Sequence, residues 1–462
     1  MSVVEASDPG GLVGVGPPPA RARRFPSGGR RNPLEALPAA AYEAPIWRSP
    51  SILGPTFLVN DPAGLKRVLL DNVANYPKTP LERRIFRALF GDGLLSSDGE
   101  TWRTHRRIMA PSFDPRSVAG YAATMAEAAS AFGDSWAGLD DGTEVDVSEQ
   151  MTGLTLEIIS RTMFSADAAG MTGTTGLALQ QSQEAAFDFN LLDILPVIGP
   201  MRLAAKERIM GEMFAPMDGA LARLIEARRT DPGRLDLLGR LVAALDEDTG
   251  ARLTPREVRD EVLTIFVAGH ETTASAMTFV WYVLSLMPQW EARLHEELDA
   301  VLGGRAPGEA DLPGLVLARR IIEECMRLYP PAPGLSARVA LAADEIAGQK
   351  IKAGSTILIS PWVLHRHRTL WDRPERFDPD RFGAEPAASR PRFAYLPFGG
   401  GPRVCIGQVL AMTEATLILA SLAQRFRLRL RPGYRVEIQQ RVTIRPRGGL
   451  PMRVERRRPA RV

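Results

Sequence analysis

The sequence is short of cysteine and histidine. Of its 462 residues, two are cysteines, Cys325 and Cys405, and five are histidines. Two cysteines in unlike contexts in a chain of this size indicate no disulfide framework, so we expect a reducing, intracellular setting. No cysteine or histidine is paired at the spacing of a zinc motif, which disfavours a zinc site.

The sequence also lacks the apolar segments of a secreted or membrane-anchored protein. Residues 1–45 are rich in Gly, Pro, Ala and Arg, without the apolar core of a signal peptide or the roughly 20 apolar residues of an anchor. We expect a poorly ordered tail there and a cytoplasmic protein without a membrane anchor. The net charge is only +3, with the arginines spread over several patches, which argues against nucleic acid as a partner.

What the chain does contain is ordinary globular material, with 45% hydrophobic and 24% charged residues. From about residue 55 to residue 328, apolar residues recur at helical spacing. From about residue 338, alternating β-branched residues and Gly or Pro turns predict hairpins. Asp61 followed by Pro62 predicts the start of one helix. The chain is therefore predicted to be mainly α with small β-sheets.

One predicted helix, residues 262–287, is apolar on nearly every face except at its centre. His270 and Glu271 would be costly at that depth in a membrane, so a helix through a protein core fits better. Gly269 and the two threonines that follow Glu271 predict a place where the helix loosens. Two interpretations stay open: a kink with a solvated glutamate, or an acid and an alcohol that deliver protons beside a bound ligand.

A second unusual segment is F-G-G-G-P-R-V-C-I-G-Q, residues 398–408, which places Cys405 in a glycine-rich loop ahead of an apolar helical run. A lone cysteine in such a turn fits a buried structural residue. The spacing of Phe398, Arg403 and Gly407 around the cysteine makes the pattern far more specific. It resembles the haem-binding signature of the cytochrome P-450 family, in which the cysteine thiolate is the proximal ligand of the haem iron.

Two further segments support this resemblance and occur in the family's order. A-G-H-E-T-T, residues 268–273, resembles the oxygen-activating segment of the family's long central helix. E-C-M-R-L-Y-P-P, residues 324–331, resembles its Glu-x-x-Arg helix. The resemblance spans about residues 50–455, which is most of the chain.

The Glu-x-x-Arg segment predicts a buried ion pair. Glu324 and Arg327 are three residues apart and share one helical face, where a carboxylate and a guanidinium bind each other well. In the family a further arginine, from a Pro-x-Arg-Phe segment, completes the pair. This chain offers Arg376 and Arg381, and we choose Arg381 because of its distance to the cysteine.

The resemblance implies the cytochrome P-450 fold, with haem b between the long central helix and the helix after the cysteine loop. It implies one domain over residues 46–455, between the tail of residues 1–45 and a basic tail of residues 456–462. The implied site residues are the metal ligand Cys405; the cofactor contacts Trp102, Arg106, Ala268, Arg338, Phe398, Arg403 and Gly407; the catalytic Glu271 and Thr272; the ion-pair network Glu324, Arg327 and Arg381; and the substrate-pocket residues Phe187, Phe189, Phe266, Leu335, Val442 and Thr443. His105 is expected to be a neighbour of this site and not a ligand.

The function that the resemblance implies is that of an oxidoreductase, a monooxygenase that inserts one atom of dioxygen into an apolar small molecule. Because no flavin or nicotinamide domain follows residue 455, electrons are expected from a separate ferredoxin or flavodoxin and its reductase, with the enzyme a monomer. Arg103 and Arg107 are candidate docking charges, although a solvated face is the simpler explanation for both. The alternatives are a peroxide-driven enzyme of the same fold and a non-enzymatic haem sensor or carrier.

Overall fold

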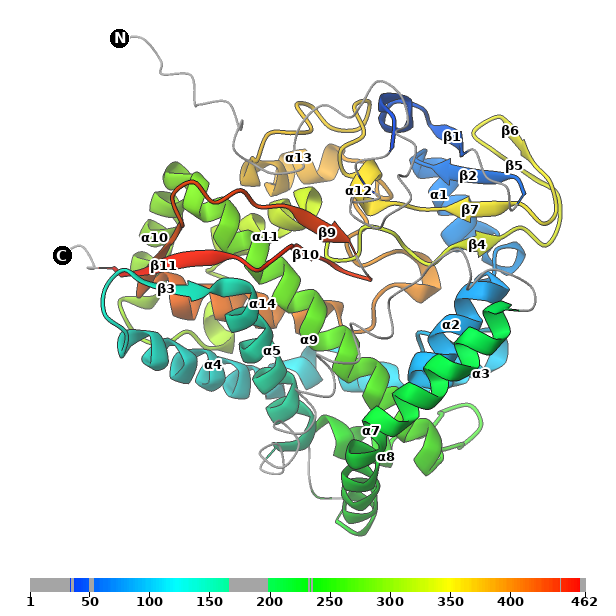
Figure 1. Cartoon of the computed structure of the whole chain (residues 1–462), viewed down its shortest axis with the longest axis horizontal. Coiled ribbons are helices and arrows are strands. Elements are labelled where there is room, and N and C mark those ends of the chain that lie inside the picture. Colours follow the sequence, from blue (N-terminus) through cyan, green and yellow to red (C-terminus); the bar gives the residue numbers. More distant parts are fainter. Residues whose placement is uncertain are drawn as a thin grey trace.

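The structure is a computed structural model that describes residues 34, 37–49, 54–165, 198–231, 233, 236–440 and 442–457. Helices make up most of it, and the strands form four small sheets of two to four strands within the described residues (Figure 1). The prediction of a mainly helical chain with small sheets is therefore confirmed. None of the helices in these ranges is long and apolar enough to cross a membrane.

The central helix α9 (Pro255–Leu286) crosses the middle of the molecule (Figure 1). It begins with a capping box, in which the Thr254 hydroxyl accepts from the Glu257 backbone and the Glu257 carboxylate accepts from the Thr254 backbone. Most of its side chains are buried, because it packs against α5 (Val147–Phe164), α11 (Val316–Leu328) and α14 (Gln408–Ala423).

The polar centre of α9 does not interrupt the helix, which corrects the prediction that it loosens there. A Cβ atom added at Gly269 would lie 3.3 Å from Cδ1 of Ile159 on α5, so the glycine serves close helix packing. The Thr272 hydroxyl donates to the Ala268 carbonyl at 2.7 Å, a bond compatible with an intact helix.

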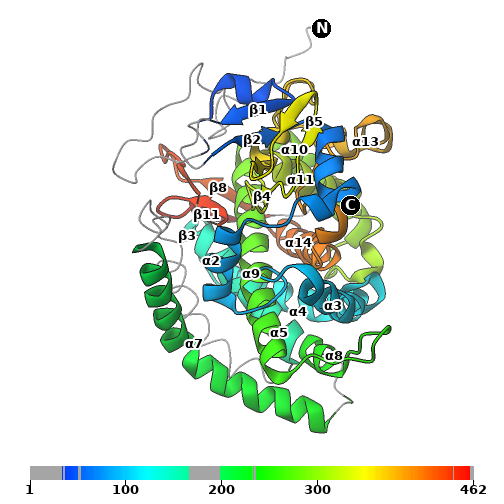
Figure 2. The same cartoon turned by 90° about the vertical axis from the view of Figure 1, so that its right-hand side faces the viewer.

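The other helices surround this bundle. The predicted start of α1 is confirmed, because the Asp61 carboxylate accepts from the Gly64 backbone at 2.6 Å and Pro62 occupies the first turn. The long α7 runs along the outside of the molecule (Figure 2). The remaining helices are α1 (Pro62–Lys66), α2 (Pro80–Phe90), α3 (Gly99–Met109), α4 (Pro115–Ala137), α7 (Ile198–Thr230), α8 (Leu237–Ala243), α10 (Pro288–Leu302), α12 (Pro361–Leu364) and α13 (Ala384–Ser389).

The largest sheet has the order β1-β2-β7-β4, in which β2 and β7 are parallel and the other pairs antiparallel. A three-stranded antiparallel sheet has the order β3-β11-β8, and the two hairpins are β5-β6 and β9-β10. The strands are β1 (Ile46–Ser49), β2 (Thr56–Val59), β3 (Thr143–Asp146), β4 (Arg338–Val339), β5 (Asp344–Ile346), β6 (Gln349–Ile351), β7 (Thr356–Leu358), β8 (Phe426–Leu430), β9 (Ile438–Gln440), β10 (Ile444–Pro446) and β11 (Pro451–Arg456).

Packed structure begins earlier than the sequence suggests. Ala41 and Tyr42, in the predicted tail of residues 1–45, are buried in a short 3₁₀ helix, Ala39–Tyr42. The Asn60 amide donates to the Ala41 and Ala44 carbonyls at 2.8 and 3.1 Å, which fixes this segment beside β2. The described part of the tail is therefore tied down by a side chain that no local pattern reveals.

Two apolar cores meet at the site described next. The larger surrounds α9, and the smaller lies under the sheet β1-β2-β7-β4. One cavity has Leu69 and Leu335 of the smaller core on its wall together with Met326 and Leu410 of the larger. Its walls therefore come from segments far apart in the sequence.

Candidate active site

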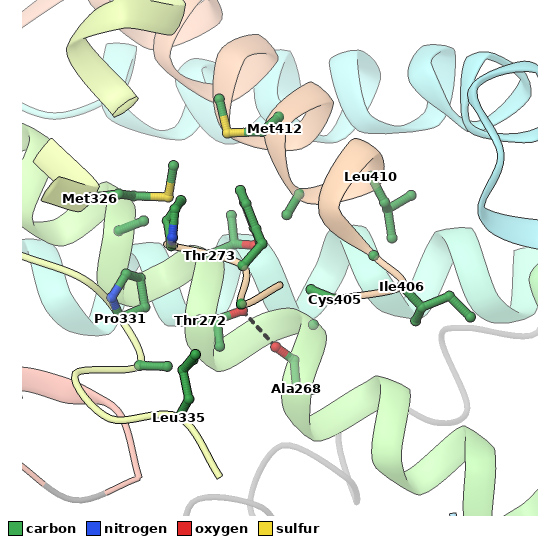
Figure 3. A pocket seen from close by; sticks show the side chains of 18 of the residues that line it. Ala268, Thr272, Thr273, Met326, Pro331, Leu335, Cys405, Ile406, Leu410 and Met412 are labelled. Atoms are coloured by element: carbon green, nitrogen blue, oxygen red, sulfur yellow. Dashed lines mark hydrogen bonds between the residues drawn. The ribbon is translucent and has the colours of Figure 1, made fainter. Parts of the chain in front are cut away.

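The cavity has a volume of about 330 Å³ and lies between α9, α11, α14 and the loop that carries Cys405. Ala268 and Thr272 of α9 lie on one side, and Cys405 and Ile406 of the loop face the same space (Figure 3). Most of the wall is apolar. A flat, largely apolar group with a few charged substituents matches such a lining.

The cysteine loop has a fixed backbone. The Cys405 N–H donates to the Phe398 carbonyl at 2.9 Å, and Gly399 and Gly401 adopt φ angles of +75° and +69°. A Cβ atom at Gly401 would also collide with the Leu69 carbonyl. Glycine is thus required where the loop turns and where it packs against η3 (Arg67–Asp71).

The Cys405 side chain is exposed to this cavity. Burial raises the pKa of its thiol, and a hydrogen bond from the Gly407 backbone and the positive charge of Arg106 offset that rise only in part. A bound metal ion would itself favour the thiolate, the form of cysteine that binds metals. A single cysteine facing the cavity suits a haem iron, which can take its protein ligand from one cysteine. Within the described ranges no cluster of three or more His, Cys, Asp or Glu side chains could hold a metal ion.

Positive charges gather at one end of the cavity. The Arg403 guanidinium lies 4.1 Å from the centre of the Trp102 ring and also donates to Asp98. Arg338 is 5% exposed, and its Nε and Nη1 atoms have no hydrogen-bond partner. Arg338 and Arg403 both line the cavity.

Lys78 belongs to the same cluster of cations as Arg338 and Arg403, although the sequence did not identify it as a site residue. It is buried, and its ammonium group donates to the Leu95 carbonyl. Burial, followed by the charges of Arg403 and Arg338, lowers its pKa to about 7. Nothing in the sequence around Lys78 distinguishes it from a surface lysine.

The charged groups at this end of the cavity test whether a haem fits there. Three buried or half-buried cations, Lys78, Arg338 and Arg403, face two carboxylates, Asp98 and Glu82. Unpaired buried cations are costly, and the Arg338 guanidinium, whose Nε and Nη1 atoms have no partner, would find one in a haem propionate. The residues therefore fit the group, with Cys405 facing the same cavity.

The acid and the alcohol of α9 face different surroundings. Thr272 lines the cavity, whereas Glu271 does not. The Glu271 carboxylate is half-buried and accepts a 2.6 Å hydrogen bond from the Thr443 hydroxyl. Adjacent helical residues point about 100° apart, so one side chain faces the cavity and the other faces the β9-β10 hairpin.

Glu414 of α14 is a further wall residue that sequence reasoning missed. It is buried and lines the cavity; its Oε2 accepts a 3.3 Å hydrogen bond from Thr273, and its Oε1 has no partner. Burial raises the pKa of this carboxyl to about 8. In the apolar sequence of α14, a single glutamate is expected to face solvent. The burial of Glu414 therefore becomes visible only in the packed structure.

The ion-pair network of α11 is fully buried. Arg327 donates from Nε to Glu324 at 2.6 Å and from Nη2 at 2.8 Å. The Arg381 Nε atom lies 3.6 Å from the same carboxylate, whereas Arg376 contributes only its backbone carbonyl to Arg327. Further bonds from Arg327 to the His365 and Pro374 carbonyls join α11 to the segment after α12.

The residues predicted for α3 lie on two sides of that helix. Trp102 and Arg106 are half-buried on the side of the cysteine loop. His105 is buried, and its Nδ1 forms a 2.8 Å hydrogen bond with the Glu261 carboxylate of α9, which joins the two helices. Of the candidate docking charges, Arg107 pairs with Asp246 at 2.8 Å and Arg103 with Glu100 at 2.9 Å.

The predicted substrate pocket is only partly found at the cavity. Leu335 lines it, as do the predicted cofactor contacts Ala268, Phe398 and Gly407. Phe266 is instead a core residue that packs against Phe164, with the ring centres 6.1 Å apart. Val442 and Thr443 do not line the cavity, and the Thr443 hydroxyl instead bonds Glu271, which does not face the cavity either. Phe187 and Phe189 lie outside the described residues.

Comparisons with known proteins agree with this geometry. A sequence model of the family described as Cytochrome P450 matches residues 39–450. The chain is 36% identical to cyclooctatin synthase of Streptomyces melanosporofaciens, over 90% of this chain and 89% of that protein. It is 35% identical to cyclooctat-9-en-7-ol 5-monooxygenase of the same organism, over 87% and 86% of the two proteins. Among solved structures it is similar to the cytochrome P450DA haem domain, with a TM-score of 0.80, 30% identity and 90% of each chain covered.

Proposed function

The chain belongs to the cytochrome P450 family and is a monooxygenase that uses haem b and dioxygen, and on that premise we propose its substrate class and the roles of its residues. The substrate proposed is an apolar, unsaturated carbocycle with few polar groups, such as a cyclic terpene or its alcohol. The single observation that carries the proposal is the apolar cavity with Cys405 and Thr272 on its wall. The name of one relative, cyclooctat-9-en-7-ol 5-monooxygenase, supports the substrate class.

The residues that would hold the cofactor come from three parts of the chain. We assign Cys405 as the ligand of iron, and Arg338, Arg403 and Lys78 as the partners of the propionates. Trp102 supports Arg403 by stacking under its guanidinium. Bound haem supplies the iron that activates dioxygen, and a thiolate ligand donates electron density that favours cleavage of the O–O bond.

The chain supplies the protons that this cleavage consumes. The Thr272 hydroxyl, now donating to the Ala268 carbonyl, can turn into the cavity and donate there. Glu271, half-buried beside it, exchanges protons with solvent and passes them inward. The apolar wall restricts bulk water, which favours this route for the proton that O–O cleavage needs. Electrons come from a separate redox protein, as in the ferredoxin or flavodoxin systems expected from the sequence.

The test of this assignment is Thr272→Ala. We expect the variant to consume reduced nicotinamide at close to the original rate while product falls roughly tenfold or more and hydrogen peroxide rises, the loss typical of a general acid. The measurement is product and peroxide formed per reduced nicotinamide consumed.

Thr278→Ala is the matched control. Thr278 also lies on α9 and makes the same bond to a preceding carbonyl, at 2.7 Å to Ala274, but it does not line the cavity. This control should keep the original ratio. If Thr272→Ala kept it too, the proposed proton role of Thr272 would be refuted.

A further inference from the structure

The turn of the β9-β10 hairpin is fixed to α9 by two side-chain hydrogen bonds. The Thr443 hydroxyl donates to Glu271 at 2.6 Å, and the Ser275 hydroxyl donates to the Ile444 carbonyl at 2.7 Å. Glu271 and Ser275 are four residues apart, so they lie on one face of α9. Together they bind two consecutive residues of the hairpin.

The same turn is also bonded to the cavity wall. The Ile444 N–H donates to the Pro331 carbonyl at 3.0 Å, and Pro331 lines the cavity (Figure 3). Ile444 is fully buried, so this contact is shielded from solvent. A displacement of the wall at Pro331 is therefore transmitted to Thr443 through one residue.

In the hydrogen bond between Thr443 and Glu271, the donor is shielded from solvent and the acceptor is partly exposed. Thr443 is 3% exposed, whereas its neighbour Val442 is 37% exposed and Glu271 is half-buried. A hydrogen bond from a buried hydroxyl to a carboxylate is charge-assisted and holds the side chain in one rotamer. In that rotamer the carboxylate faces the hairpin, while Thr272 faces the cavity.

We propose that Thr443 is a positioning residue that holds the Glu271 carboxylate away from the cavity until the hairpin turn is displaced. A substrate that presses on the wall at Pro331 displaces Ile444 and Thr443, and the released carboxylate can then turn toward Thr272. Delivery of the proton that O–O cleavage consumes is thereby linked to occupancy of the cavity. This inference rests on the proposed role of Glu271 as the proton donor.

The decisive variant is Thr443→Val, which keeps the shape of the side chain and removes the hydroxyl. Reconstituted with an electron donor and no substrate, it should release on the order of tenfold less hydrogen peroxide per reduced nicotinamide consumed, because one charge-assisted hydrogen bond no longer restrains the acid that supplies the proton for O–O cleavage. Thr443→Ser restores the hydroxyl and should restore the wild-type peroxide ratio. Equal peroxide ratios for wild type and Thr443→Val would overturn the proposal.

A double variant shows whether Thr443 acts through Glu271. In a Glu271→Gln background, Thr443→Val should have no further effect on the peroxide released per reduced nicotinamide consumed without substrate. If its effect persisted there, Thr443 would act only by shaping the pocket, and the proposal would be wrong. If Glu271→Gln alone changed neither product nor coupling, the proposed proton donor would fail and the inference with it, which distinguishes the two failures.

A measurement without turnover tests the link to the cavity. Phenylimidazole, a bulky haem ligand, should fill the cavity and speed amide hydrogen exchange at Ile444, whose N–H bonds to Pro331. The exchange of Arg445, the next residue of β10, is the internal reference. Unchanged or slower exchange at Ile444 with phenylimidazole bound would contradict the proposed displacement of the turn.

Discussion

At the scale of single residues, Cys405 is the residue on which the site depends. It is the only cysteine on the cavity wall, since the other, Cys325, is buried in α11 with its thiol pKa raised by burial. We predict that Cys405→Ser abolishes the red-shifted Soret band of the reduced carbonmonoxy complex, because an alcohol replaces the thiolate. Cys325→Ala should keep the band. An unchanged spectrum in Cys405→Ser would exclude this cysteine as the ligand.

Glu414 makes a prediction about stability and pH. Burial raises the pKa of its carboxyl from an ordinary 4.5 to about 8, so the folded state holds a proton that the unfolded state releases. Its contribution to stability is fully present below about pH 4.5 and is lost as the pH rises through about 8. Relative to wild type, Glu414→Gln should gain about 1.4 kcal/mol per pH unit in that window.

Urea unfolding of Glu414→Gln and wild type at several pH values measures this difference. Glu296→Gln, at an exposed glutamate of α10, is the matched control. Parallel curves of unfolding free energy against pH for Glu414→Gln and wild type would show that Glu414 is ionised in the folded protein.

The site residues that the sequence identified owe their role to local motifs, whereas those that it missed owe it to burial by distant segments. Cys405 and Thr272 belong to short local motifs whose spacing carries their chemistry, so the sequence was sufficient to select them. Lys78 and Glu414 are ordinary charged residues in their local context, and their importance comes from burial by distant segments. Phe266 is the opposite case. Its place beside the segment of residues 268–273 suggested a pocket residue, but it packs in the core against Phe164.

At the scale of elements, the cysteine loop depends on its contact with η3. Gly401→Ala should destabilise the protein by more than the roughly 1 to 2 kcal/mol expected for a left-handed residue alone, because the new methyl group meets the Leu69 carbonyl. Haem content after purification should fall as well. Urea unfolding and the haem-to-protein absorbance ratio measure the two effects.

Gly433→Ala separates the cost of a left-handed backbone conformation from the cost of the close contact with the Leu69 carbonyl. Gly433 has a φ angle of +76°, but a Cβ atom there meets nothing within 4 Å. This variant should lose only the conformational part of the free energy and keep its haem. Equal losses in the two variants would show that the loop does not need its close contact with η3.

Elements were predictable where one physical rule dominates. Asp61 and Pro62 marked the start of α1 correctly, because capping is a local interaction. The continuity of α9 was not predictable from Gly269, since its effect depends on how closely α5 approaches. The β9-β10 hairpin was visible as alternation, but its attachment to Glu271 depends on tertiary packing.

At the scale of the whole molecule, the cavity lies where residues of two apolar cores form one wall. The buried network of Glu324, Arg327 and Arg381 fixes α11 against the later segments, and removing one partner of such a network leaves a costly buried charge. The composition indicated a large core, but the place where the cores meet follows from the complete chain path. This arrangement puts Cys405, Arg338, Arg403 and Thr272 around one space.

The most direct test of the account is turnover under isotopically labelled dioxygen. The enzyme would be reconstituted with a ferredoxin, its reductase and a cyclic terpene alcohol, with catalase present to remove peroxide. The account predicts a hydroxylated product that carries one labelled oxygen atom per molecule. Product without the label, or product formed only when peroxide replaces the electron donor, would contradict it.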